Sequence, residues 1–229
     1  MDYIRDTKDA YKTENKAKAY QEQYTKGLKW ARFTMWRQRL IIKGLLNKCN
    51  FNGNDRILDI PCGAGFIGKI LCDTPADITA SDISQEMIKK AKSEYKGDNF
   101  KGFVECDITK TPFENESFDC VIILAFMHRL PKEIRDETWR EINRISKKYI
   151  IVNYGFDSLS QRIKKWVLKK ISSKYEPAPS SMPMNEILNE INSFGFKILS
   201  ITNVVYFFSG KVIFFLEKIL TTLSNDKNI

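Results

Sequence analysis

Short apolar runs alternate along this chain with longer stretches whose apolar residues recur every three or four positions. The run from Arg56 to Ile60 ends in a glycine-rich turn, and residues with helical spacing follow it. This change of period predicts a strand, a turn and a helix. The same alternation predicts further strands at 77–80, 102–105, 119–124 and 149–154, and helices at 66–71, 84–95, 132–146 and 185–194.

The two ends of the chain depart from this alternation. Residues 1–50 contain no proline and are predicted to be helical, and residues 158–174 are predicted to form a basic helix. Residues 196–208 and 211–217 are rich in β-branched and aromatic side chains and flank Ser209-Gly210, which predicts a hairpin.

Repeated strand–helix alternation followed by a hairpin predicts an α/β fold. The sheet is expected to be mostly parallel, with helices on both faces and antiparallel strands at one edge. In such sheets a ligand binds beyond the carboxyl ends of the strands. The residues at those ends are therefore the candidates for a functional site.

The first strand end is Asp59-Ile60-Pro61-Cys62-Gly63-Ala64-Gly65. Gly63 and Gly65 allow a close approach of the backbone that a Cβ atom would block. The turn matches neither the dinucleotide fingerprint nor a phosphate loop, so a tight strand–helix turn explains it equally well. Asp82, at the second end, can accept both hydroxyls of a ribose or carry charge at a helix N-terminus.

Taken in order, these motifs resemble those of the class I S-adenosylmethionine-dependent methyltransferases. Ile57 to Gly65 resembles their first motif, with Pro61 where many members have glycine, and Asp107-Ile108 resembles their third. The resemblance covers roughly residues 55–217. It implies a Rossmann-like sheet of seven strands in the order 3-2-1-4-5-7-6, with the last strand antiparallel.

The resemblance also implies S-adenosylmethionine as cofactor. Gly63 and Gly65 would approach its methionine part, Asp82 would hold the ribose hydroxyls, Asp107 the adenine amino group, and Asp59 would order the turn or contact the cofactor amine through water. The other candidate cofactor contacts are Cys62, Ile83, Ala125, the ring-flanking Met87 and Ile108, and Tyr20 and Arg37 from an N-terminal helix that closes over the cofactor in many small-molecule members.

Methyl transfer to a hydroxyl or ammonium group requires removal of a proton. His128, the single histidine, follows the fourth strand, and its ordinary pKa of about 6.5 suits a general base. A helix-capping role is the alternative. Arg129 can bind an anionic acceptor or pair with Glu133 or Asp136, and Trp166 is a second candidate acceptor contact.

The net charge of +9 is unevenly distributed. Residues 1–50 carry +7, residues 160–175 carry +6, and the rest of the chain carries −4. Such segments favour an anionic partner, whether a phosphorylated small molecule, a membrane surface or RNA, although two solvated helix faces explain them equally well. The basic helix is expected to be a lid over the active site or an interfacial helix that reaches a lipid.

Several compositional features narrow the class of protein. The five cysteines form no C-x-x-C pair, which argues against a zinc site and a disulfide framework and indicates reduced thiols in the cytoplasm. The charged start of the chain does not resemble a secretory signal, and no apolar stretch approaches the ~18 residues of a membrane span. The fourth strand is not followed by the amide-and-proline motif of DNA amino methylases.

The sequence therefore predicts a cytoplasmic methyltransferase that acts on oxygen or nitrogen of a small or lipid-like, anionic metabolite. Peripheral membrane contact through the basic segments is expected, and nucleic acid is the less favoured partner. The alternatives are a tRNA or other RNA methyltransferase and a non-catalytic cofactor-binding regulatory protein. We expect one globular domain with four parts: a helical cap (1–50), a cofactor-binding core (51–157), a basic lid or insertion (158–184), and a C-terminal helix with a closing hairpin (185–229).

Overall fold

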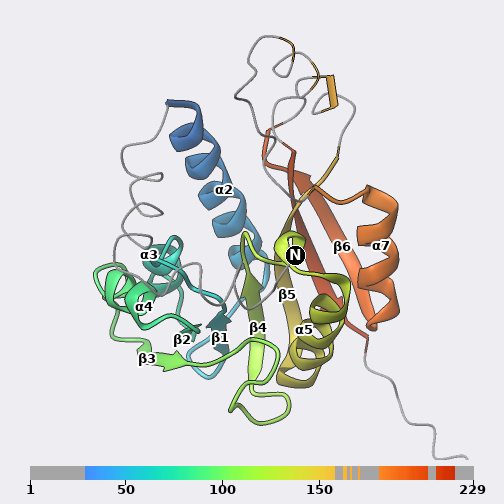
Figure 1. Cartoon of the computed structure of the whole chain (residues 1–229). Helices are drawn as coiled ribbons and strands as arrows, with labels where there is room; N and C mark the ends of the chain where they lie inside the picture. The colour runs from blue at the N-terminus through green and yellow to red at the C-terminus, as the bar shows by residue number, and fades with distance from the viewer. Residues whose placement is uncertain are drawn as a thin grey trace, which may run out of the picture.

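The computed structural model describes residues 29–157, 162, 163, 166, 170, 181–205 and 210–219, and in these residues the strands form one seven-stranded sheet (Figure 1). The strands are β1 (Arg56–Asp59), β2 (Asp77–Asp82), β3 (Phe100–Glu105), β4 (Phe118–Ile123), β5 (Ser146–Gly155), β6 (Phe196–Asn203) and β7 (Lys211–Lys218). Their order is β3-β2-β1-β4-β5-β7-β6, and β7 runs antiparallel to both of its neighbours. The predicted fold class and strand order are confirmed.

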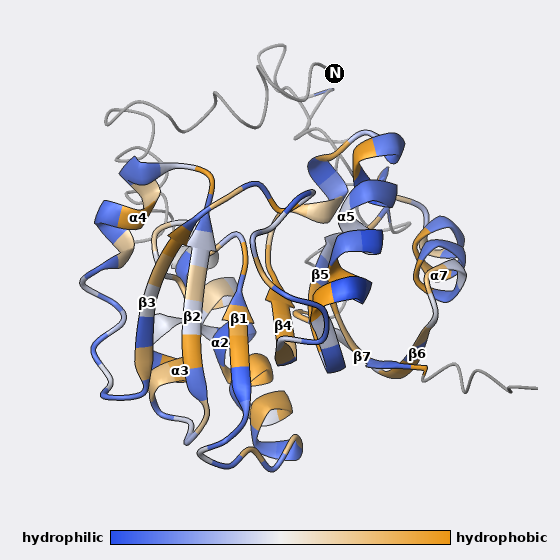
Figure 2. Cartoon of the chain, turned by 90° about the horizontal axis from the view of Figure 1, so that it is seen from below, coloured by the Kyte–Doolittle hydropathy of each residue, from blue (hydrophilic) through white to orange (hydrophobic). Residues whose placement is uncertain are grey.

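Helices cover both faces of the sheet. They are α2 (Lys29–Lys48), α3 (Gly68–Cys72), α4 (Gln85–Ala91), the 3₁₀ turn η2 (Met127–Arg129), α5 (Lys132–Ile145) and α7 (Met184–Ser193). One buried cluster packs α5 and α7 against the sheet, and a second packs α2, α3 and the end of α4. Apolar residues accordingly gather on the strands, while α5 and α7 turn polar residues outward (Figure 2). None of the described helices could cross a membrane.

The ends of two predicted helices are set by local chemistry. The hydroxyl of Ser84 accepts a hydrogen bond from the backbone N–H of Met87 and caps the start of α4, as predicted. Gly195 follows α7 with a φ of +78°, a backbone conformation that glycine adopts without the steric cost of a Cβ atom. Both residues therefore act at helix ends, as their positions in the sequence predict.

Helix α4 is shorter than predicted. It ends at Ala91, and a turn follows in which the N–H of Glu94 donates to the carbonyl of Ala91. Added Cβ atoms on Gly65 and Gly68 would lie within 3 Å of Glu94, so this turn packs directly against the glycine-rich segment. That close packing requires a turn in place of the last helical residues.

The closing hairpin pairs as predicted but with a longer connection. Asn203 pairs with Val212, and the N–H of Val204 donates to the carbonyl of Lys211. With Asn203 paired to Val212, the register does not allow the predicted two-residue turn at Ser209-Gly210, and Ser209 itself lies outside the described residues. The register buries Phe214 and its neighbours in β7 on both faces of the sheet, and this burial outweighs the local turn preference.

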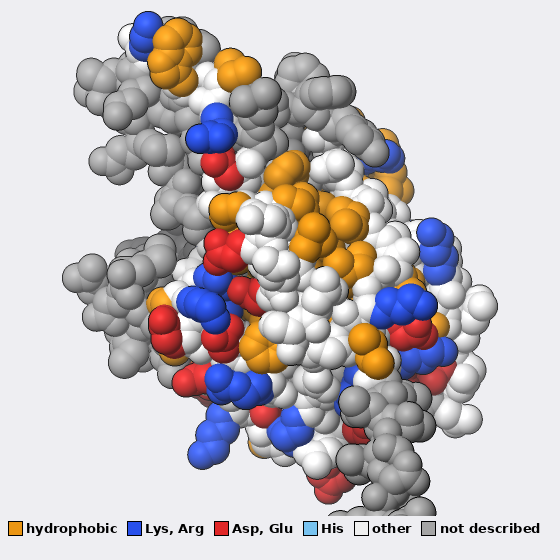
Figure 3. Space-filling view, turned by 90° about the vertical axis from the view of Figure 1, so that its right-hand side faces the viewer, with side chains coloured by type: hydrophobic (Ala, Val, Ile, Leu, Met, Phe, Trp, Pro, Cys, Tyr) orange, Lys and Arg blue, Asp and Glu red, His pale blue; other side chains and the backbone are white. Residues whose placement is uncertain are grey.

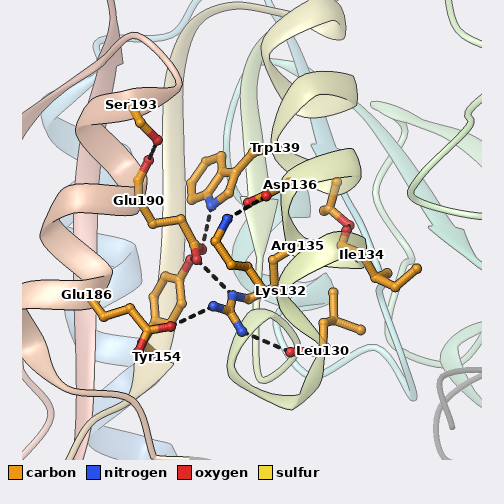
Figure 4. Close-up of polar contacts among 11 residues, drawn as sticks. Leu130, Lys132, Ile134, Arg135, Asp136, Trp139, Tyr154, Glu186, Glu190 and Ser193 are labelled. Carbon is orange, nitrogen blue, oxygen red and sulfur yellow. Dashed lines mark hydrogen bonds and ion pairs between the residues drawn. The ribbon is translucent and has the colours of Figure 1, made fainter. Parts of the chain in front are cut away.

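A buried carboxylate joins three elements on the α5 side of the sheet (Figure 4). Glu190 of α7 accepts hydrogen bonds from Arg135 Nε at 2.8 Å and Trp139 Nε1 at 2.9 Å, both on α5. It also accepts one from Tyr154 Oη on β5 at 2.9 Å. A buried charge needs this number of donors to offset the loss of its hydration.

The guanidinium of Arg135 extends this network in two directions. Its Nη2 donates to Glu186 Oε1 at 2.8 Å, and its Nη1 donates to the carbonyl of Leu130 at 3.0 Å. Leu130 follows η2 directly. The network therefore fixes α7 on α5 and also holds the end of the turn that carries His128.

The two glutamates bound to Arg135 should differ in their contribution to stability. The side chain of Glu190 is 6% exposed and that of Glu186 is 48% exposed. We expect Glu190→Gln to lower the free energy of unfolding by about 3–5 kcal/mol, because a buried guanidinium loses its charge partner. Glu186→Gln, the matched control, should cost only about 0–1 kcal/mol. Urea denaturation measures both, and equal losses would contradict this account.

Candidate cofactor and acceptor site

A cavity of about 560 Å³ opens at the carboxyl ends of β1 and β4 and is closed on one side by α2. This volume is within the range of small-molecule sites. The residues that line it are Arg32, Phe33, Met35, Trp36, Gln38 and Arg39 of α2, Asp59, the turn 61–67, Glu94, Leu124, Ala125 and Lys211. The predicted contacts Asp59, Cys62, Gly63, Gly65 and Ala125 thus line one cavity.

The conformation of the glycine-rich turn is fixed by its backbone. The N–H of Cys62 donates to the carbonyl of Ser81 at 2.7 Å, which fastens the turn to the end of β2. Gly63 and Gly65 have φ angles of +53° and +80°. A Cβ atom on Gly65 would lie 2.8 Å from the Cβ of Glu94. The absence of a side chain at Gly65 therefore lets Glu94 pack closely against the turn. Cys62 is buried, and burial raises the pKa of its thiol well above the usual value.

Asp59 is a buried carboxyl group in the cavity wall. The hydroxyl of Tyr95 donates to its Oδ2 at 2.5 Å. Burial raises the pKa of Asp59 to about 7, the hydrogen bond from Tyr95 opposes this rise, and the nearby charge of Asp82 adds to it. A ligand cation beside Asp59 would favour the ionised form, so the position suits an ammonium group.

Asp82 supports the turn from the end of β2. Its Oδ2 accepts from the N–H of Gly63 and its Oδ1 from the N–H of Ser84, both at 2.9 Å. Burial raises the pKa of Asp82 to about 6, although hydrogen bonds from backbone N–H groups lower it in part. The backbone N–H of Ile83 also contributes to the hydrogen bonding of this carboxylate. A carboxylate offers about four lone-pair sites, so some acceptor capacity remains.

The remaining adenosine candidates lie at the ends of β2 and β3 or on the adjoining helix and do not line the cavity. Met87 and Ile108 are buried, while Ile83 and Asp107 are half-buried. Oδ1 of Asp107 accepts from the N–H of Thr109 at 3.0 Å and from its hydroxyl at 2.9 Å. The structure therefore places these side chains at the expected edge of the sheet, next to the cavity.

Helix α2 faces the cavity with arginines other than the predicted one. Arg37 is exposed and does not line the cavity, whereas Arg32 and Arg39 do. Nε of Arg39 donates to the carbonyl of Phe66 at 2.8 Å, and its guanidinium lies 4.7 Å from the centroid of the Phe66 ring. Helical periodicity, applied once one inward residue is known, would have placed Arg32 and Arg39 on one face. Tyr20 lies outside the described residues.

The end of β4 is shaped by a residue that the sequence analysis did not single out. Ala125 has a φ of +55°, and its N–H donates to Oδ1 of Asn153 at 2.5 Å. Asn153 is buried on β5, the neighbouring strand. An asparagine inside an apolar strand is the sequence signal that could have indicated this role, because a buried amide needs a polar partner.

His128 follows this strand end in a cationic environment. Its pKa is lowered to about 3 by burial, and the positive charges of Arg129 and Lys211 lower it further. Its Nδ1 is buried and has no hydrogen-bond partner among the described residues. The imidazole is therefore neutral at neutral pH.

Lys211 is the second residue that sequence reasoning missed. It begins β7 and lines the cavity, and its pKa is lowered by burial and by the charge of Arg129. A lysine before an apolar strand has no distinctive sequence signal, because only the pairing of β7 with β5 brings it to this site.

The predicted acceptor-side residues do not line the cavity; they are His128, Arg129 and Trp166. Trp166 is exposed, and Nζ of Lys170 lies 4.1 Å from the centroid of its ring.

Comparisons with known proteins extend this description. Residues 57–149 match a family model described as a methyltransferase domain. The chain is 28% identical over 130 residues to the demethylmenaquinone methyltransferase of Clavibacter sepedonicus, which covers 52% of this chain and 53% of that protein. It is 30% identical over 136 residues to the glycine/sarcosine N-methyltransferase of Aphanothece halophytica, which covers 56% of this chain and 51% of that protein. The matches cover between 28% and 53% of the first curated relatives.

Among solved structures, the magnesium protoporphyrin IX methyltransferase of Synechocystis PCC 6803 with bound SAH is similar in fold. It superposes with a TM-score of 0.73 at 17% identity and covers 93% of this chain and 99% of that chain. The agreement extends over almost the whole chain, including the parts before and after residues 57–149.

The raised pKa of Asp59 predicts a pH-dependent contribution to stability. Because the folded value of about 7 exceeds the unfolded value of 3.8, the contribution is complete below pH 3.8 and is lost as the pH rises through 7. We therefore expect the stability of the wild type relative to Asp59→Asn to fall between pH 4 and 7, with a slope approaching about 1.4 kcal/mol per pH unit.

Chemical denaturation of both proteins across this pH range measures the difference. A flat difference for Asp59→Asn would show that its carboxyl group ionises normally.

Proposed function

Since residues 57–149 match a methyltransferase domain and the sheet has the strand order 3-2-1-4-5-7-6, we propose that this chain is an S-adenosylmethionine-dependent methyltransferase of class I that methylates an oxygen or nitrogen atom of a small or lipid-like, anionic acceptor. The observation that carries this proposal is the cavity beyond β1 and β4, where the glycine turn, a buried acid and several cations meet. We propose a cytoplasmic location, with which the five free cysteines agree.

The charges that line the cavity fit the methionine part of the cofactor. Asp59 and Glu94 lie on the side of the glycine turn and suit an ammonium group, while Arg32 of α2 suits a carboxylate. Arg39 is engaged with Phe66, which leaves Arg32 as the better candidate. S-adenosylmethionine, when bound, supplies a methyl group on a positively charged sulfur.

The neighbouring strand ends fit the rest of the cofactor. Asp82 keeps acceptor capacity beyond the backbone N–H groups that it binds, and it is proposed to accept from the ribose hydroxyls. Asp107 is proposed to accept from the adenine amino group, with Met87 and Ile108 beside the ring. Because Asp82 also holds Gly63, loss of its charge would disturb the turn as well as the ribose contact.

The acceptor side is proposed to lie near Lys211. Lys211 and Arg129 are close enough to each other for their charges to interact, so an acceptor anion between them would relieve their repulsion. Trp166 is proposed as an apolar acceptor contact from the basic segment. An anionic acceptor is also favoured because desolvation strengthens its attraction to the buried ammonium group of Lys211.

His128 is proposed as the general base. It is neutral at neutral pH and can therefore accept a proton, but its low pKa makes it a weak base by itself. An acceptor anion near Arg129 and Lys211 would offset the two positive charges, whereas burial of the ring, the largest cause of the low pKa of His128, would remain. The imidazole would therefore be a stronger base with the acceptor bound than without it.

Cofactor binding by the full chain is the first test of this proposal. Isothermal titration should detect binding of S-adenosylmethionine, and Asp82→Asn should weaken it about tenfold or more, because charge-assisted hydrogen bonds are lost. Asp77→Asn, a carboxylate at the other end of the same strand, should bind as the wild type does. No binding by the folded wild type would overturn the proposal.

Turnover with labelled cofactor distinguishes the alternatives. Product formed from lipid or metabolite pools supports the proposed function. Product formed only from tRNA, with activity that falls steeply with salt, would favour an RNA methyltransferase. Cofactor binding without turnover in any pool would favour a regulatory protein.

The role of His128 is tested with His128→Asn, which retains a polar side chain of similar size. We expect kcat/KM to fall about 10²–10⁴-fold while the Kd for S-adenosylmethionine changes less than about twofold. The pH profile of kcat should lose its acidic limb. Turnover within about threefold of the wild type would remove His128 from the mechanism.

A further inference from the structure

Helix α2 exposes an apolar stripe to solvent. Phe33, Trp36 and Leu40 are 43%, 55% and 43% exposed, and their spacing places them on one side of the helix. The opposite side is buried, with Thr34 and Gln38 in the first half of the helix and Ile42, Leu45 and Leu46 in the second. The first half of α2 therefore buries polar residues and exposes large apolar ones, the reverse of what a helix packed only against its own sheet normally shows.

The charge of α2 is entirely positive. Over residues Lys29–Lys48 it carries six basic residues and no acidic residue. The basic residues are Lys29, Arg32, Arg37, Arg39, Lys43 and Lys48. Aromatic and aliphatic side chains among arginines and lysines are typical of helices that lie in the headgroup region of a bilayer.

A second group of exposed residues has the same character. Ile163 and Trp166 are 55% and 59% exposed, and both are helical, as are Arg162 and Lys170. In Figure 1 the described helical pieces between β5 and α7, coloured yellow to orange, lie at the top of the view, as does the start of α2. Two separate parts of the sequence thus present apolar and basic side chains at one end.

We propose that this end of the molecule docks on a bilayer that contains anionic lipids. Phe33 and Trp36 also line the cavity, so the docking surface borders its opening. A lipid acceptor would then enter the cavity directly from the bilayer. This last step depends on the proposed function, whereas docking itself does not.

The side chains favour a bilayer over the other partners. RNA would stack on Phe33 and Trp36, but Leu40 and Ile163 offer no aromatic ring for a base. A second copy of the chain would bring two basic surfaces together, and their repulsion opposes association. Anionic headgroups complement the arginines, and the hydrocarbon boundary accommodates all five apolar residues, Phe33, Trp36, Leu40, Ile163 and Trp166.

Strand β6 supplies a matched control surface. Leu199 and Ile201 are 39% and 45% exposed on this edge strand. The view toward this edge shows an apolar patch bordered mainly by uncharged surface (Figure 3). Ile201 therefore matches Leu40 in exposure, and β6 carries a single basic residue, Lys197, four positions away.

The test is co-sedimentation of the full-length protein with vesicles of phosphatidylcholine, alone or mixed with phosphatidylglycerol. The wild type should bind the mixed vesicles, and the binding should weaken with salt. Leu40→Glu should lower the partition coefficient roughly tenfold or more, because a charge replaces a side chain that enters the interface. Ile201→Glu should bind within about twofold of the wild type.

Several outcomes would overturn the docking proposal. They are no binding by the wild type, equal binding by Leu40→Glu, or an equal loss in Ile201→Glu. A dimer in light scattering that Leu40→Glu dissociates would assign the surface to self-association, and competition by tRNA at this surface would assign it to RNA. Titration of the wild type with S-adenosylmethionine separates the two proposals, because vesicle binding without cofactor binding would contradict the proposed function alone.

Discussion

The cavity depends on two buried carboxyl groups at neighbouring strand ends. Asp82 holds the glycine turn through the N–H of Gly63, and Asp59 lies in the cavity wall with Tyr95 as its partner. Burial raises the pKa of both, so each is electrostatically costly when ionised in the absence of a cation. A positively charged ligand lowers that cost, so the two carboxyl groups favour the binding of a cation in this cavity.

The turn that carries His128, where the acceptor side is proposed to lie, depends on a different buried charge. Glu190 and Arg135 fix α7 to α5, and Arg135 also binds the carbonyl of Leu130, directly after the turn that carries His128. The position of this turn is therefore linked to the packing of α5 and α7, which belong to the same buried cluster as Met127 and Leu130. Glu190 and Arg135 are buried, so water cannot replace a hydrogen-bond partner that either of them loses. Burial therefore favours the one arrangement of α5 and α7 in which the two groups are paired.

The sequence predicted the cavity residues that lie close together along the chain. It missed most of those that come from distant segments and reach the cavity only through folding. Asp59, Cys62, Gly63 and Gly65 lie in one short turn and line the cavity together. Which face of α2 turns toward the cavity depends on how the helix packs. The sequence therefore predicted Arg37 as a cofactor contact, whereas Arg32 and Arg39 line the cavity. Asn153 and Lys211 reach the site through β5 and β7, and their roles follow from strand pairing.

By itself, the sequence determined the class of fold, the order of its elements and the strand ends that carry chemistry, because hydrophobic periodicity and turn residues act over short distances. Only the tertiary structure decided which side chains face the cavity, how burial shifts their pKa values, and that the stripe of Phe33, Trp36 and Leu40 is left exposed. These properties depend on contacts between distant segments, and desolvation is set by the whole fold rather than by any local pattern.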